Sequence, residues 1–409
     1  MKEKFLGVKQ ARRWLGWSVF AIVMIPSVFT GFFPGKIVVI SALCGYSVVS
    51  LLFLSKLPTS SFSGRQIFKF FLVYSCFMYV RGFLNIDSDY DVYSLFCSSL
   101  FLCFLIPHFI FLSQPQCFSF VLKGVLCLGV PLCLVTLFYP PSDEQLSFAH
   151  NASFLYLFLL FVPFIKKKWI VLILFASIFV VTYNLDRRSI LVNMAFAFTV
   201  SIAWLLTKST LLLKVFFCGI VSVTCILLTL GLSGVFNVFQ VMGETYDYSL
   251  DEEARNLFVD SRTGIYNDVF GGLSSKNSIL FGLGVNGKTE TSLIDAVSFD
   301  FSEIYKHGRP STESGMLNYI QYGGIVGGIL YSLFILFAGY RATFSANNAL
   351  LRLVGVFLAF KFTFSFIEDK VTFNANTLIV FLCIGLCYNK EFCSMSDGEI
   401  NQYLRRVFK

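Results

Sequence analysis

The sequence has few charged residues and few histidines for its length. Charged residues make up 14% of its 409 residues, whereas a soluble domain has about 25%, so an ordinary soluble globular domain is excluded. The histidines, His108, His150 and His307, lack metal-ligand spacing, which argues against a catalytic zinc site. There is no internal repeat at solenoid period and no low-complexity linker. We therefore expect a single membrane domain that carries one large insertion.

Cysteine is absent from the long polar segment at residues 233–314, although the chain contains 12 cysteines. All of them lie in or next to apolar stretches or on the C-terminal tail. The sequence therefore predicts no disulfide framework. Cys383 and Cys387, four apart on an expected helix, are predicted to be buried small apolar residues, because a soft-metal site needs more ligands than these two supply.

Long apolar runs recur along almost the whole chain, and hydrophobic residues make up 56% of it. Each run is long enough to cross about 30 Å of hydrocarbon as a helix. The runs are apolar all round, which excludes a transmembrane barrel of alternating strands. We predict an all-α polytopic integral membrane protein of about twelve transmembrane helices, at residues 14–34, 36–55, 67–85, 92–113, 118–139, 149–165, 169–185, 189–207, 210–232, 315–340, 349–367 and 372–389.

The charges fall unevenly on the two sides of these helices. With the N-terminus in the cytoplasm, 20 of the 32 Lys and Arg residues lie on the cytoplasmic side, together with only Glu3, Glu391, Asp397 and Glu399 of the 24 acids. This positive-inside bias predicts that both termini are cytoplasmic. The basic residues 1–13 lead into an apolar run with no small-residue cleavage site, so we expect an uncleaved first helix. The net charge of +8 therefore reflects the orientation of the chain in the membrane.

The predicted organisation is a bundle of nine helices at 1–232, an extracytoplasmic loop at 233–314, three helices at 315–389 and a cytoplasmic tail at 390–409. The loop carries twelve acidic and six basic residues, which excludes a diffuse basic patch for nucleic acid. Its capping-box spacing at Ser249 and Glu252 predicts an amphipathic helix that ends at Gly271-Gly272. The apolar side of that helix would rest on the bundle or on lipid headgroups.

Arginines stand at the outer ends of the predicted helices, where the positive-inside rule disfavours them. Arg187 and Arg188 would either snorkel to headgroups, pair with Asp186, or bind phosphate bidentately. Arg255, Arg262 and Arg309 of the loop are either solvated charges or further members of an anion clamp.

Glu313 is the loop carboxylate closest to the tenth predicted helix. It is a candidate general base, or a helix N-terminal carboxylate with Ser311 or Thr312 as the cap, and the two roles are compatible. His307 is a bystander or a second catalytic candidate because it lies close to Glu313.

Three further features lie inside the predicted helices. Gly323-Gly324 and Gly327-Gly328 favour close helix approach over ligand binding. Arg81 and Lys361 carry charges at or near membrane depth, and each is therefore a candidate for a functional role. The alternatives are that these side chains snorkel to the outer surface, or that Lys361 pairs with Glu368.

Several of these residues resemble motifs of the O-antigen polymerase and ligase superfamily of bacterial polysaccharide assembly. The resemblance covers about residues 180–340. It rests on Asp186-Arg187-Arg188, Ser261-Arg262-Thr-Gly-Ile-Tyr, the turn FGLGVNG, and Glu313-Ser314 followed by nine residues and Gly324-Ile-Val-Gly327. Ligases of the superfamily carry a histidine where this chain has Glu313. That departure favours a polymerase over a ligase.

The resemblance implies a metal-independent glycosyltransferase without a cofactor in the bacterial inner membrane, with the large loop in the periplasm. Its donor and acceptor would be glycans on undecaprenyl diphosphate. Glu313, with His307 as second candidate, would be the base, and Arg187, Arg188, Arg262, Arg309 and Arg255 would bind the diphosphate. Membrane lipid, a chain-length regulator and a flippase of the same pathway are the implied partners. An O-antigen ligase and a transporter of lipid-linked oligosaccharide remain alternatives.

Overall fold

The computed structural model describes residues 62–88, 91–92, 95, 113–124, 154–183, 188–232, 261–290, 308–369 and 375–408. The predicted helices at 14–34 and 36–55, and most of those at 92–113 and 118–139, lie outside these residues. Within them the structure is helical, with isolated bridges and no named strand. The elements are α3 (Arg65–Gly82), η1 (Phe83–Asn85), α6 (Pro115–Gly124), α9 (Phe154–Phe161), η5 (Val162–Phe164), α10 (Lys167–Tyr183), α11 (Arg188–Thr207), α12 (Thr210–Leu232), α15 (Ser261–Ser275), α17 (Gly315–Ser345), α18 (Ala349–Phe364), α19 (Ala375–Tyr388), α20 (Lys390–Ser394) and α21 (Asp397–Val407).

Four of the described helical stretches are long and apolar enough to cross a membrane, at 66–85, 189–207, 210–230 and 315–345. Each coincides with a predicted membrane helix, and shorter apolar helices at 155–164 and 379–388 match two more. Large apolar side chains of α3 and of η1, which follows it, face outward at helical spacing, namely Phe70, Val73, Phe77, Val80 and Leu84. An outward apolar stripe is expected where lipid replaces water. The described part is therefore that of an all-α membrane protein.

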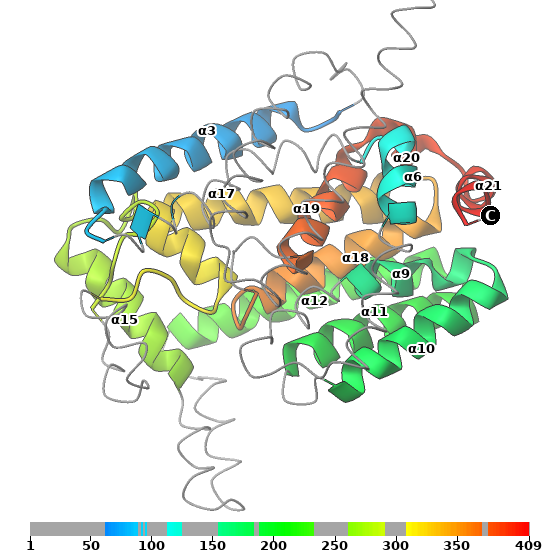
Figure 1. Cartoon of the computed structure of the whole chain (residues 1–409), viewed down its shortest axis with the longest axis horizontal. Coiled ribbons are helices and arrows are strands. Elements are labelled where there is room, and N and C mark those ends of the chain that lie inside the picture. The colour runs from blue at the N-terminus through cyan, green and yellow to red at the C-terminus, as the bar shows by residue number, and fades with distance from the viewer. Residues whose placement is uncertain are drawn as a thin grey trace, which may run out of the picture.

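α17 is the central helix of the described bundle. It packs on α18, α3 and α19, and α18 in turn packs on α12 and α11 (Figure 1). Aromatic rings fill the interior, with Phe71 of α3 stacked on Phe334 at 4.6 Å and Tyr319 stacked on Tyr331 at 4.1 Å. Gly323 and Gly327 lie against Tyr74 and Met78 of α3, so the predicted close helix approach is confirmed at these two glycines.

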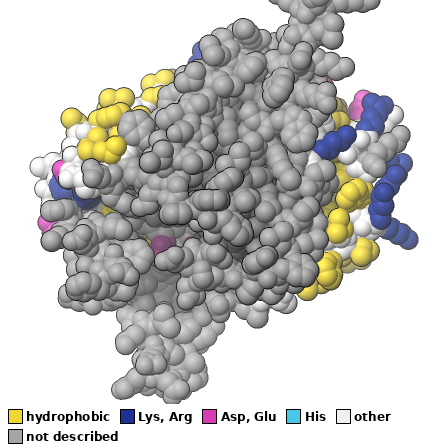
Figure 2. All heavy atoms as spheres, in the orientation of Figure 1, with side chains coloured by type: hydrophobic (Ala, Val, Ile, Leu, Met, Phe, Trp, Pro, Cys, Tyr) yellow, Lys and Arg dark blue, Asp and Glu magenta, His cyan; other side chains and the backbone are white. Residues whose placement is uncertain are grey.

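One end of the bundle gathers the segments that the charge bias assigned to one side. Trp169 Nε1 donates to the Phe408 carbonyl at 2.8 Å, Tyr403 Oη donates to the Pro115 carbonyl at 2.5 Å, and Asn347 N donates to the Cys393 carbonyl at 2.9 Å. Figure 2 shows Lys and Arg side chains at the end where α21 lies. Exposed basic residues there include Lys390, Arg405 and Arg406. Loops predicted to share a side thus contact one another.

Asn348 holds two segments of this end together. Its Oδ1 caps α18 by accepting from Leu351 N at 2.9 Å, and its Nδ2 donates to the Phe392 and Met395 carbonyls at 2.8 and 2.9 Å. Because Asn348 is fully buried, we expect Asn348→Ala to lower the free energy of unfolding by about 2–4 kcal/mol. Asn347→Ala is the matched control, since exposed Asn347 makes one long bond at 3.3 Å. Equal thermal unfolding midpoints of the two variants in detergent would contradict this.

α17 is broken at Gly324, where φ is 64° and ψ is −164°. In an uninterrupted helix Ile325 N and Val326 N would donate to the carbonyls of Gln321 and Tyr322. Here Ile325 N donates to the Ile279 carbonyl at 2.9 Å and Val326 N to the Leu280 carbonyl at 3.2 Å. The freed carbonyls of Gln321 and Tyr322 accept from Leu283 N and Gly284 N at 2.9 and 2.8 Å.

Residues 279–287, the inserted loop, therefore replace the missing bonds of the broken helix. Such replacement is required wherever irregular backbone lies at membrane depth. Side chains of α3 and η1 also bond to the loop backbone. Arg81 Nη1 donates to the Phe281 carbonyl at 3.1 Å, and Asn85 Nδ2 donates to the Leu283 and Val285 carbonyls at 2.9 and 3.0 Å. Arg81 thus binds the loop backbone.

The part of α17 that follows the break, residues 325–345, is by itself about 31 Å long at 1.5 Å per residue. That length matches the hydrocarbon thickness of a bilayer. The part that precedes the break, residues 315–323, would then stand at the membrane boundary, together with the inserted loop.

Candidate functional site

The candidate site lies where α17 begins. Ser314 is the N-cap of α17, because its Oγ accepts from Leu317 N at 3.3 Å while donating to the Ser365 carbonyl at 2.8 Å. The prediction of Ser311 or Thr312 as the cap is therefore wrong. The backbone of the first turn is fixed by the turn that follows α18: Gly315 N donates to the Glu368 carbonyl and Met316 N to the Ser365 carbonyl, both at 2.9 Å.

Two buried amide side chains of α17 hold the chain that leads into the helix. Asn318 Oδ1 accepts from Thr312 N at 2.8 Å and its Nδ2 donates to the Thr312 carbonyl at 2.9 Å. Gln321 Nε2 donates to the Gly287 and Arg309 carbonyls at 2.7 and 2.9 Å. Neither amide was singled out from the sequence, although each lies within a predicted membrane helix, where a polar side chain is itself a signal.

Glu313 stands between these fixed neighbours with an exposed side chain. Thr312 and Ser314, on either side of it, are buried and hydrogen-bonded. The carboxylate also lies next to the N-terminus of α17, where the backbone N–H groups favour negative charge. The arrangement presents one carboxylate to water from a backbone with little freedom to move.

Arg309 is held by its backbone beside the inserted loop. Arg309 N donates to the Thr289 carbonyl at 2.7 Å and Thr289 N donates back at 3.1 Å. The guanidinium Nε donates to the Ser311 carbonyl at 3.0 Å, and the side chain is half-buried. Arg309 and Glu313 are thus both fixed at the entry to α17.

Two other predicted arginines are placed only by their helices. Arg188 is the first residue of α11, and Arg262 lies in the first turn of α15. The side chains of both lie outside the described residues, as do Arg187, Arg255 and His307 entirely. No contact between these groups and Glu313 is therefore assigned.

α15 rests on the bundle with its apolar side. Ile265, Val269 and Leu273 are buried against Leu283 and Leu317, which confirms the predicted apolar contact. The predicted stop at Gly271-Gly272 is wrong, because the helix continues to Ser275. A Cβ at Gly272 would lie 2.8 Å from Thr289 Cγ2, so this glycine permits close packing. Tyr266 Oη donates to the Phe366 carbonyl at 2.8 Å and ties α15 to the turn after α18.

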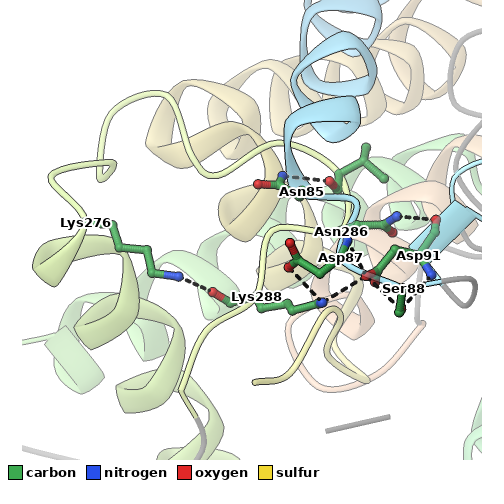
Figure 3. Close-up of polar contacts among 8 residues, drawn as sticks. Asn85, Asp87, Ser88, Asp91, Lys276, Asn286 and Lys288 are labelled. Carbon is green, nitrogen blue, oxygen red and sulfur yellow. Dashed lines mark hydrogen bonds and ion pairs between the residues drawn. The ribbon is translucent and has the colours of Figure 1, made fainter. Parts of the chain in front are cut away.

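A buried charge pair lies beside the inserted loop. Lys288 Nζ is 2.9 Å from Asp91 Oδ2 and 3.2 Å from Asp87 Oδ2, and Asn286 Nδ2 donates to the Asp91 carbonyl at 2.7 Å (Figure 3). Ser88 Oγ also donates to Asp91 at 2.9 Å. Sequence reasoning did not find this pair, because Lys288 is about 200 residues from Asp87 and Asp91.

The pKa of Asp91 reflects opposing effects. Burial favours the neutral acid, but hydrogen bonds from Lys288, Ser88 and the Asp87 backbone outweigh it and lower the pKa below its ordinary value. For Lys288 burial favours the neutral amine, and the bonds to Asp91 and Asp87 outweigh it and raise its pKa. The folded state therefore favours both charges.

These shifts predict the pH range over which the pair stabilises the fold. The lowered pKa of Asp91 contributes stability above about pH 4, and this contribution is lost as the pH falls through the pKa of the folded state. The raised pKa of Lys288 contributes stability below about pH 10, and this contribution is lost as the pH rises through the pKa of the folded state.

We expect Asp91→Asn to lower the free energy of unfolding by about 3 kcal/mol between pH 5 and 9. Thermal unfolding in detergent should show the gap to wild type closing below about pH 4. Asp87→Asn, at an exposed carboxylate, should cost less. A gap that is constant from pH 3 to 7 would contradict the assignment.

Lys361 of α18 pairs with Asp369, the residue that follows its predicted partner Glu368. Lys361 Nζ lies 2.6 Å from Asp369 Oδ2 and donates to Asn193 Oδ1 of α11 at 2.8 Å. Asp369 has the rare positive φ of 68° and pairs with Ser314 through the backbone.

The described cysteines are free thiols, and Cys383 and Cys387 are fully buried as predicted. Among the residues that the structure describes, no three His, Cys, Asp or Glu side chains are arranged to hold a metal ion. At the entry to α17 the structure thus places the exposed carboxylate of Glu313 and the fixed Arg309, and two other described helices begin at or near an arginine. No family model, curated protein or solved structure matches this chain.

Proposed function

We propose that this chain polymerises undecaprenyl-diphosphate-linked oligosaccharide repeat units into O-antigen or a related surface polysaccharide. The observation that carries the proposal is the setting of Glu313. Its carboxylate is exposed, while Thr312 and Ser314 on either side are buried and hydrogen-bonded. Arg309 is fixed four residues before it. This is the setting expected of a base that meets a substrate arriving from the membrane surface.

In the proposed reaction Glu313 accepts the proton of an acceptor sugar hydroxyl. The hydroxyl oxygen forms a bond to the anomeric carbon of the donor glycan, and the bond from that carbon to the diphosphate oxygen breaks. The diphosphate leaves with the electron pair, so its developing charge needs positive partners. Arg187, Arg188, Arg255, Arg262 and Arg309 are the proposed partners, and His307 is a second candidate base. Guanidinium groups meet this need without a metal.

The proposed setting is a bacterial inner membrane with about twelve helices, both termini in the cytoplasm and the loop at 233–314 in the periplasm. The positive-inside bias supports this orientation. The lipid tails of donor and acceptor would lie in the bilayer and their diphosphates at its surface. That is the level at which residues 315–323 of α17 would stand. A flippase and a chain-length regulator are the proposed partners.

A transporter of lipid-linked oligosaccharide is the second candidate, and the break at Gly324 is the feature that bears on it. Broken helices commonly line transport sites, where their free backbone groups bind substrate. Here the amides of Ile325 and Val326 and the carbonyls of Gln321 and Tyr322 are bonded to the inserted loop. Because these groups are occupied by protein, the break supports loop anchoring more than transport. A ligase is the third candidate, with Glu313 in place of the ligase histidine as the argument against it.

One experiment separates the three candidates. The purified protein in nanodiscs is incubated with lipid-linked repeat units extracted from source cells that lack its gene, with and without the final acceptor. A polymerase produces a ladder of longer lipid-linked glycans without the final acceptor. A ligase produces a product only when that acceptor is added. In liposomes, a transporter moves the substrate across the bilayer with no elongation, which would overturn the proposal.

A further inference from the structure

Lys361 is a fully buried cation inside an apolar bundle. Its side chain is 1% exposed, and Nζ lies 5.8 Å and 5.6 Å from the ring centroids of Tyr156 and Phe364. Its close partners are Asp369 Oδ2 at 2.6 Å and Asn193 Oδ1 at 2.8 Å. A buried ion pair seldom adds more stability than apolar residues of the same volume. An ionisable group at membrane depth is therefore a functional candidate by default.

The three residues join the starts of two helices that are far apart in the sequence. Asn193 lies in the second turn of α11, which begins at Arg188. Asp369 pairs through its backbone with Ser314, the N-cap of α17 and the neighbour of Glu313. Lys361 bonds to both, so one ammonium group connects the base of α11 with the first turn of α17. Its bonds are directional and of fixed length, which apolar packing would not provide.

The connection continues through the turn that follows α18. The Ser365 carbonyl accepts from both Ser314 Oγ and Met316 N, and the Glu368 carbonyl accepts from Gly315 N. The same turn accepts from Tyr266 of α15 at the Phe366 carbonyl. The turn at 365–369 therefore touches α17 and the helix that carries Arg262, while Lys361 links its last residue to α11.

We propose that Asn193, Lys361 and Asp369 form a positioning unit that sets where the backbone at Glu313 stands relative to the start of α11, where Arg188 lies. This inference rests on the proposed function, in which Glu313 is the base and the arginines bind the diphosphate. Lys361 does not itself contact substrate, because it is buried and bonded to protein. It acts through Asp369 on the backbone of Ser314, and through Asn193 on α11. The unit thus fixes the backbone that carries the proposed base relative to the start of α11.

The test uses a variant that removes both charges, since removal of one would leave the other buried and unpaired. In Lys361→Met/Asp369→Asn, the amides of Gly315 and Met316 should exchange with deuterium about tenfold faster, because their acceptor turn is no longer held. In the elongation assay, kcat should fall about tenfold or more with KM unchanged, because misplacement of a base costs rate and not binding. Asn193→Leu should shift both readouts in the same direction.

Thr224→Val is the matched control. Thr224 Oγ1 lies 2.6 Å from Thr363 Oγ1, so this change removes another buried polar contact of α18 that does not lead to Ser314. It should leave exchange at residues 315–316 and kcat at wild-type values. The inference would be overturned if the amides of residues 315–316 exchange at the wild-type rate in the charge-free variant. It would also be overturned if the loss of activity only follows the amount of folded protein and Thr224→Val shows the same loss. Absence of elongation by the wild type would overturn the proposed function instead, and exchange alone would then decide whether the unit holds α17.

Discussion

Replacement of Gly282 with valine should detach the inserted loop from α17 and destabilise the protein by about 3–5 kcal/mol. A Cβ at this position would lie 2.4 Å from Gly324 N and 2.5 Å from Gly323 N, and φ is +66°. Both atoms belong to backbone, so no side-chain rotation relieves the clash. The left-handed φ adds a second cost that only glycine avoids. Thermal unfolding of the purified variant in detergent measures the effect.

Gly271→Ala is the control for this prediction. Gly271 lies within α15, and a Cβ there would meet nothing within 4 Å. Alanine should therefore be neutral or stabilise the protein by about 0.5–1 kcal/mol. Should Gly282→Val unfold at the same temperature as Gly271→Ala, the four backbone bonds between the inserted loop and α17 do not form.

Glu313→Gln should lower the rate of glycan elongation about 10²- to 10⁴-fold, the usual contribution of a general base. Glutamine keeps the size of the side chain and one acceptor oxygen, but it is not a base and does not take up the proton of the acceptor hydroxyl. Because Glu313 is exposed, the free energy of unfolding should change by no more than about 0.5 kcal/mol. Initial rates with lipid-linked repeat units, normalised to folded protein, test the prediction.

Glu290→Gln provides the comparison, since Glu290 is another exposed carboxylate of the same loop. Its variant should elongate glycans at the wild-type rate. Full-length polymer from Glu313→Gln would place the base elsewhere, with His307 as the next residue to replace. Equal losses in both variants would instead indicate that the charge of the loop matters and not one carboxylate.

Helix positions followed closely from the sequence. The predicted helix at 210–232 matches α12, and those at 189–207 and 315–340 begin within one residue of α11 and α17. In a membrane every backbone group must be bonded within its own segment or to protein. An apolar run of sufficient length therefore determines a helix locally. The break in α17 did not follow, because the same glycines are compatible with close helix packing, as Gly323 shows against Met78.

The candidate site was only partly predictable. Glu313 was located at the entry to α17, but its neighbours were misassigned. Ser311, Thr312 and Ser314 are all suitable N-caps. Ser314 is the one used, and its Oγ also bonds the Ser365 carbonyl 51 residues along the chain. The amides of Asn318 and Gln321 were visible as polar residues in an apolar run, yet their acceptors lie on the loop that precedes the helix.

The sequence by itself determined that the chain is helical and apolar, where its longest helices begin, and that one polar loop precedes α17. These properties depend on neighbouring residues and on the energetic cost of unbonded backbone in lipid. Only the tertiary structure decided that Lys361 pairs with Asp369, that Lys288 pairs with Asp91, and that residues 279–284 complete the broken helix. The Lys288–Asp91 pair and the bonds of residues 279–284 join segments from about 40 to 200 residues apart. Which of several suitable partners comes within reach depends on the packing of the whole bundle.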